Sequence, residues 1–170
     1  MSRAHLIRRL GWYYPTELFN TVAASGVILY VLFTTRWTDT LFLMYGLVIV
    51  TWILFQGQHY WGLKLRRLNN RPVDQPRELA LFRAMEHSNL WLIGLMPFVL
   101  LVQLVLADWS IGPEHLLPWA LLANGFAILE HINYYIRQLT VDNWPDVKYL
   151  LRNRRLKPAS LRKDLESGRI

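Results

Sequence analysis

The chain has 170 residues, of which 53% are hydrophobic and 18% are charged, with a formal net charge of +7. This length predicts a single domain, and the absence of cysteine excludes disulfide bonds, zinc–thiolate sites and thiol catalysis. The positive charge does not indicate a nucleic-acid partner, because no recognition motif accompanies it.

The apolar residues gather into four blocks, each near the roughly 20 residues that a helix needs to cross a bilayer. The blocks are Glu17–Thr35, Asp39–Leu63, Ala84–Ala107 and Leu116–Gln138. We therefore predict an all-α integral membrane protein in which four spanning helices form a bundle over residues 1–138. Residues 139–170 are predicted to form a basic, amphipathic cytoplasmic tail.

Basic residues mark one side of this predicted bundle. They precede the first block, fill the connection between the second and third blocks, and follow the fourth, whereas Arg36 alone lies on the other side. Such a bias is typical of cytoplasmic loops, so both termini are predicted to lie in the cytoplasm, with the protein in a bacterial inner membrane. The same charge predicts attraction to anionic lipid head groups.

The first part of the chain predicts contact with the membrane surface. Residues 2–10 mix basic and apolar side chains and are predicted to form a surface helix, and the aromatic residues 12–14 follow where the chain enters the bilayer. Small residues at 23–26 of the first block would allow a second helix to approach closely.

The later part of the chain carries helix-start signals. Pro118 suits the first turn of the fourth block. After that block, Asp142 or Asn143 is predicted to cap an interfacial helix that continues to about Arg155. Ser160 is predicted to cap one more short helix.

Polar side chains inside the apolar blocks are the candidates for function, because ionisable groups are costly in hydrocarbon. The predicted topology places them in one layer near the cytoplasmic face. The candidate catalytic residues are Glu86, His87, Glu130 and His131. The candidate ligand-binding residues are His59, Asn89, Asn133, Tyr135 and Gln138.

Several interpretations of this layer stay open. The polar groups could pair with one another, for example Glu130 with Arg137. They could form a metal site, although the usual metal-binding spacings are missing, or a haem site with two histidines. They could carry out acid–base chemistry at a lipid head group. The candidate metal ligands are His59, His87, His131 and Glu130, with Glu86 as a further oxygen donor.

The leading functional hypothesis is a non-catalytic subunit or accessory factor of a membrane assembly. The chain is small, its predicted outer connections are short, and it contains no recognised catalytic motif. Its predicted partners are the lipid bilayer and other membrane proteins or further copies of itself. The alternatives are a membrane-embedded enzyme that acts on a lipid-like substrate, with or without a metal, and proton or ion transport through Glu130. No cofactor is assigned.

Overall fold

The computed structural model describes residues 3–110, 112–141 and 144–170. The described part of the chain folds into α-helices and one short 3₁₀ turn, which confirms the predicted all-helical class. The elements are α1 (Arg3–Thr34), α2 (Trp37–Leu68), α3 (Gln75–Leu106), the 3₁₀ turn η1 (Pro113–His115), α4 (Leu117–Tyr135), α5 (Trp144–Asn153) and α6 (Ser160–Ser167).

Three of these helices, α1, α2 and α3, are long and apolar enough to cross a membrane. Helix α4 has 19 residues and is not among the helices that meet this criterion. Asn124, Glu130 and His131 interrupt its apolar sequence. The structure therefore supports membrane association through three helices, and the fourth span stays a prediction.

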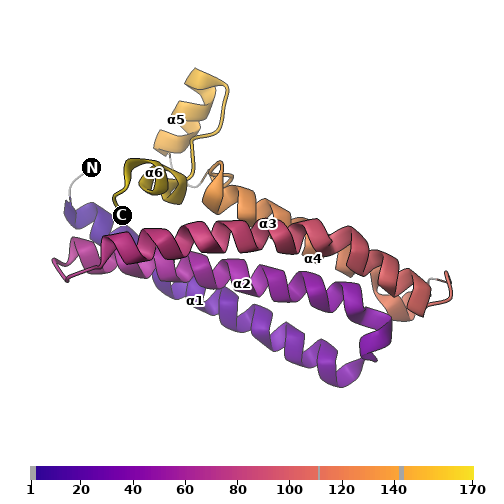
Figure 1. Cartoon of the computed structure of the whole chain (residues 1–170). Helices are drawn as coiled ribbons and strands as arrows, with labels where there is room; N and C mark the ends of the chain where they lie inside the picture. Colours follow the sequence, from indigo (N-terminus) through magenta and orange to yellow (C-terminus); the bar gives the residue numbers. More distant parts are fainter. Residues whose placement is uncertain (1–2, 111, 142–143) are drawn as a thin grey trace.

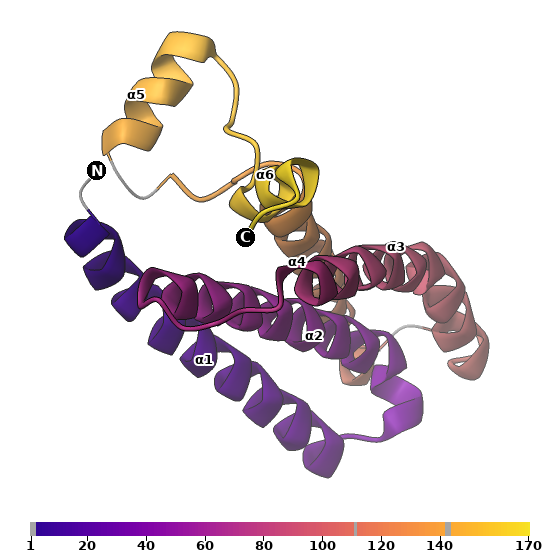
Figure 2. The same cartoon turned by 60° about the vertical axis from the view of Figure 1, so that its left-hand side comes forward.

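Helix α2 is the central element of the fold. It packs against α1, α3 and α4, whereas α3 and α4 contact each other less extensively. Figure 1 shows the start of α1, the connection between α2 and α3, α6 and both termini at one end of the molecule, and Figure 2 turns this end toward the viewer. We call this end, which gathers the N-terminus, the end of α2, the end of α4 and α6, the terminal end.

Several predicted boundaries are wrong. Helix α1 runs without interruption from Arg3 through Pro15, so the predicted surface helix and the first block form a single helix. Helix α4 stops at Tyr135, because Ile136 leaves helical geometry, and the predicted span to residue 138 is too long. Ala159, and not Ser160, is the N-cap of α6. The prediction for Pro118 in the first turn of α4 is confirmed.

The predicted cap at Asp142 or Asn143 lies outside the described residues. The helix that follows it, α5, ends at Asn153, slightly before the predicted Arg155.

Close packing between α2 and α4 depends on two glycines of α2. A Cβ added at Gly46 would lie 2.6 Å from Asn124 Nδ2 and 2.9 Å from the Asn124 backbone nitrogen, which is closer than real contacts allow. A Cβ at Gly57 would overlap the Tyr134 hydroxyl. Glycine at both positions therefore lets α4 lie directly on α2.

The helices differ strongly in how much of their apolar surface is buried. In the most apolar 18-residue stretch of α2, 56% of the residues are buried, and the corresponding fractions are 17% in α3 and 6% in α1. Large side chains such as Phe19, Phe33, Trp91 and Phe98 point outward from α1 and α3. Apolar faces of this extent require a lipid or protein neighbour, because their exposure to water is energetically unfavourable.

Candidate functional site

The most deeply buried polar contact joins three helices. Gln56 of α2 and Asn89 of α3 exchange two hydrogen bonds of 2.9 Å, in which each side-chain amide donates to the oxygen of the other. Tyr135 of α4 donates to Gln56 Oε1 at 2.6 Å. All three residues are fully buried. The polar atoms of Asn89 and Tyr135, both predicted as ligand-binding, are thus engaged in holding α2, α3 and α4 together.

A second buried amide bonds to the backbone where α2 is irregular. Thr40 departs from helical geometry, with φ −122° and ψ 19°. Gln103 of α3 accepts a hydrogen bond from the Phe42 backbone N–H at 3.1 Å and donates to the carbonyls of Asp39 at 2.7 Å and Thr38 at 3.0 Å. A single side chain therefore supplies hydrogen-bond partners to three backbone groups around the irregular turn.

Asn124 of α4 extends this second group. Its Nδ2 donates to the carbonyls of Phe42 and Ala120, both at 2.9 Å. Its Oδ1 is buried and has no hydrogen-bond partner among the described residues. Asn124 therefore ties α4 to α2 through the backbone of α2.

The three histidines of the predicted layer lie in three separate environments. His59 donates from Nε2 to Glu78 Oε2 at 2.8 Å. His87 is exposed and donates from Nδ1 to the Arg83 carbonyl at 2.7 Å. His131 is buried and stacks on Tyr135 with ring centroids 5.2 Å apart, and its Nδ1 has no partner in the described chain.

The structure consequently does not assemble the metal ligand set that the sequence suggested. Among residues 3–110, 112–141 and 144–170, no group of three histidine or acidic side chains has an arrangement that could hold a metal ion. The physical reason is rotation of the helices. Shared depth in a bundle brings side chains together only when their helix faces also turn toward one another, and His87 turns outward.

The carboxylates of the predicted layer are also separated. Glu130 is half-buried and accepts one long hydrogen bond, 3.4 Å, from Asn133. It makes no ion pair in the described part of the chain, and the suggested partner Arg137 lies on the exposed segment after α4. Glu86 lies 3.5 Å from the guanidinium of Arg162 on α6.

The two remaining candidates hold the turn that follows α4. Asn133 Oδ1 accepts from the backbone N–H of Leu139 at 2.9 Å and from the Thr140 hydroxyl at 3.2 Å. Gln138, predicted at the end of the fourth span, lies beyond the helix and donates to Asp146 Oδ2 at 2.8 Å. Both side chains therefore shape the route of the chain from α4 toward α5.

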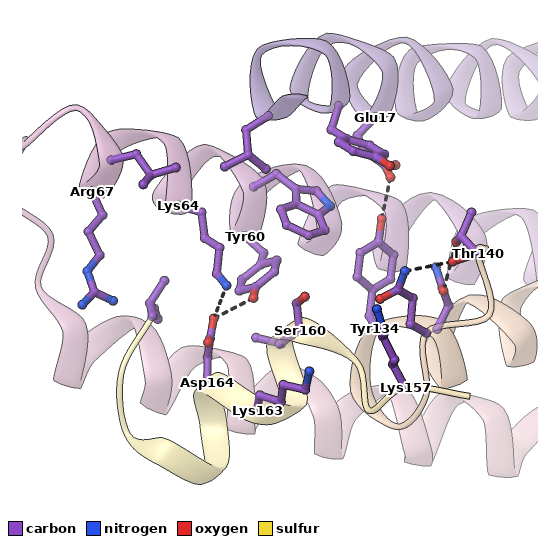
Figure 3. Close-up of a pocket in the computed structure, with 18 of the residues that line it drawn as sticks. Glu17, Tyr60, Lys64, Arg67, Tyr134, Thr140, Lys157, Ser160, Lys163 and Asp164 are labelled. Carbon is purple, nitrogen blue, oxygen red and sulfur yellow. Dashed lines mark hydrogen bonds and ion pairs between the residues drawn. The ribbon is translucent and has the colours of Figure 1, made fainter. Parts of the chain in front are cut away.

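A cavity of about 730 Å³ lies at the terminal end. Its wall combines the first half of α1, the last turns of α2, the end of α4 with the segment that follows it, and α6 (Figure 3). Leu10, Trp61 and Leu161 give it apolar surface, and the ring of Tyr13 stacks on Trp61 with centroids 5.9 Å apart.

Helix α6 completes this cavity and is held by specific contacts. Asp164 accepts from the Tyr60 hydroxyl at 2.6 Å and forms an ion pair with Lys64 at 2.9 Å (Figure 3). Leu161 and Leu165 are buried beneath the helix. The sequence predicted a tail on the membrane surface, but α6 docks on the helices and forms part of the cavity wall.

Glu17 is the functional candidate that the predicted site set did not contain. It lies in the cavity wall and accepts from the Tyr134 hydroxyl at 2.8 Å through Oε1. Its second oxygen, Oε2, is buried and has no hydrogen-bond partner among the described residues. The sequence could have indicated Glu17, because it follows the aromatic residues 12–14 and its predicted depth is that of the polar residues on the other helices.

Comparison with known proteins gives no relative to which this geometry could be matched. No family model matches the chain, and no curated protein and no solved structure is significantly similar to it. The fold and contacts thus define an all-helical protein with three apolar helices compatible with a membrane.

Proposed function

We propose that the chain is a small polytopic membrane protein in which α1 to α4 all span the bilayer. Three of these helices are apolar enough on their own. For α4, the support comes from its outer surface, where Trp119, Leu122 and Phe126 are exposed while its polar side chains turn inward or toward the terminal end. A helix of 19 residues is long enough to cross the hydrocarbon core.

We further propose that the terminal end faces the cytoplasm of a bacterium. The last turn of α2 and the connection after it, which carry Arg66, Arg67 and Arg71, lie at this end (Figure 1). The connections at the opposite end carry Asp108 and Glu114 and the single arginine Arg36. Basic loops favour the cytoplasmic side of a membrane. In this orientation α5 lies at the inner surface, with Trp144 and Leu151 exposed toward lipid.

Reporter fusions test the orientation. Alkaline phosphatase, which is active only outside the cytoplasm, is expected to be inactive after Ile170 and active when fused after Ser110. A fluorescent protein that folds only in the cytoplasm should give the reverse result. Phosphatase activity at both positions would contradict the proposed topology.

We propose that the protein acts as a non-catalytic subunit or accessory factor of a membrane assembly. The observation that carries this proposal is the exposure of α1, in which only 6% of the most apolar window is buried. The interior amides engage one another or the backbone, which is a structural role. An apolar helix that contacts mainly one neighbour has room for a partner in the bilayer.

A pair of glycine substitutions tests whether α1 binds a partner. Gly26 on α1 and Gly94 on α3 are both exposed, and an added Cβ would meet nothing within 4 Å at either position. Gly26→Leu and Gly94→Leu should therefore both leave the fold of the single chain intact. Close helix contacts depend on small residues, so only Gly26→Leu is expected to disrupt the assembly.

The measurement is the mass of the complex extracted in a mild detergent, compared with 20.1 kDa for one chain. A multiple of this mass indicates a homo-oligomer, and any other larger mass indicates a different subunit. Finding only the single chain, or equal masses for wild type and both variants, would refute a partner on this face of α1.

A further inference from the structure

We propose that the cavity at the terminal end is a binding site for an anionic ligand with a phosphate group, namely the head group of a glycerophospholipid. Arg67, Lys163 and Arg169 are the cationic side chains that would hold the phosphate. This inference does not depend on the proposed role as a subunit. The expectation that the ligand is a lipid does rest on the proposal that the terminal end meets the inner leaflet.

The charged side chains of the cavity wall leave a positive surplus. The wall contains five basic and three acidic side chains, which are Lys64, Arg67, Lys157, Lys163, Arg169, Glu17, Asp146 and Asp164. Lys64 is paired with Asp164, and Lys157 is paired with Asp146. The three other cations make no ion pair with any part of the chain that the structure describes.

The paired residues keep the unpaired cations in place. Asp164 is held by both Tyr60 and Lys64, which fixes α6 against the last turns of α2. Lys163 precedes Asp164 on α6, and Arg67 lies one helical turn beyond Lys64 on α2. Cations from two helices therefore border one space, and an arginine guanidinium can bind a phosphate through two parallel hydrogen bonds.

The opposite part of the cavity indicates what else the ligand carries. Figure 3 places Arg67 and Glu17 at opposite sides of the view, with Tyr60, Lys64 and Asp164 between them. Glu17 Oε2 is buried and unpartnered, so it can accept a hydrogen bond from a ligand hydroxyl. Phosphatidylglycerol carries both kinds of group, an anionic phosphate and head-group hydroxyls.

The size and apolar surface of the cavity agree with this class of ligand. Ligand pockets commonly enclose about 300 to 1,000 Å³, and this cavity measures about 730 Å³. Leu10 and Trp61 line it beside the exposed apolar face of α1, along which acyl chains could extend. A wholly polar metabolite would leave these side chains uncovered.

Native mass spectrometry of the full chain in a non-ionic detergent tests the proposal. Phosphatidylglycerol, phosphatidylcholine and glycerol 1-phosphate are titrated separately, and the bound fraction gives each dissociation constant. The cavity variant is Arg67→Gln combined with Lys163→Gln. The matched control is Arg66→Gln combined with Lys148→Gln, which removes the same charge from exposed residues of α2 and α5 outside the cavity.

We expect phosphatidylglycerol to bind the wild type and the control variant equally, and the cavity variant to bind it about tenfold or more weakly, since two cation–phosphate contacts are lost. Phosphatidylcholine should bind at least as weakly to the wild type as phosphatidylglycerol does to the cavity variant. Binding of glycerol 1-phosphate with the same dependence on Arg67 and Lys163 would support the site and identify a soluble phosphate ester as its ligand.

Three results would overturn the proposal. The first is no saturable binding of either phosphatidylglycerol or glycerol 1-phosphate. The second is an equal loss of affinity in the cavity and control variants, and the third is equal affinity of the wild type for phosphatidylcholine and phosphatidylglycerol. The far-UV circular dichroism of both variants must match that of the wild type. If one double variant does not fold, the single substitution Arg169→Gln tests the third cation of the cavity instead.

Discussion

The contact between Gln56, Asn89 and Tyr135 allows a sharp test of how buried amides stabilise the helices. Gln56→Leu leaves three groups without partners, namely both polar atoms of the Asn89 amide and the Tyr135 hydroxyl. At about 1 kcal/mol for each orphaned group, the free energy of unfolding should fall by about 3 kcal/mol. Asn89→Leu orphans only Gln56 Nε2, because Tyr135 still donates to Gln56 Oε1, and should cost about 1 kcal/mol.

The double variant separates this explanation from simple loss of packing. With Gln56 and Asn89 both replaced by leucine, only the Tyr135 hydroxyl lacks a partner, so the expected cost is about 1 kcal/mol. The second substitution should therefore restore about 2 kcal/mol of the stability lost in Gln56→Leu. The assay is reversible unfolding in mixed micelles, followed by far-UV circular dichroism. Additive costs in the double variant would refute the reasoning.

Three further predictions concern other contacts. Gln103→Leu should lower the free energy of unfolding by about 3 kcal/mol in the same assay, because three backbone groups around Thr40 lose their partners, and an unchanged value would contradict this role. Gly57→Val should weaken the packing of α4 on α2 through overlap with Tyr134, costing about 1 to 3 kcal/mol, whereas Gly125→Val, where an added Cβ meets no atom, should cost under about 1 kcal/mol. Asp164→Asn removes the ion pair with Lys64, so it should release α6 and speed proteolysis of the C-terminal segment several-fold. An unchanged cleavage rate would show that the buried side chains of Leu161 and Leu165 are sufficient to hold α6.

The helices were predictable because hydropathy and helix signals act along the chain. The apolar blocks located the long helices, and Pro118 correctly indicated the start of α4. Boundaries were less predictable where tertiary contacts override local signals. The chain leaves α4 at Tyr135, and Asn133 binds the backbone of the returning segment, an interaction with residues that lie after the helix.

The pairing of the candidate site residues could not be predicted from the sequence. The sequence located Asn89, Tyr135 and the histidines in one layer, yet it carries no direct information about the rotation of each helix. That rotation turns Asn89 toward Gln56 and leaves His87 exposed. The cavity was not predictable, because it requires α6 to dock through Asp164, more than a hundred residues after its partner Tyr60.

The docking of α6 also has a consequence for biosynthesis. Helices α1 to α3 precede α6 in the chain and can enter the membrane while the ribosome is still translating. The cavity wall, however, needs Ser160, Lys163 and Asp164, which emerge only after every long helix has been made. The cavity is therefore complete only after the chain has been translated through α6, and any ligand of the cavity binds as a late step of maturation.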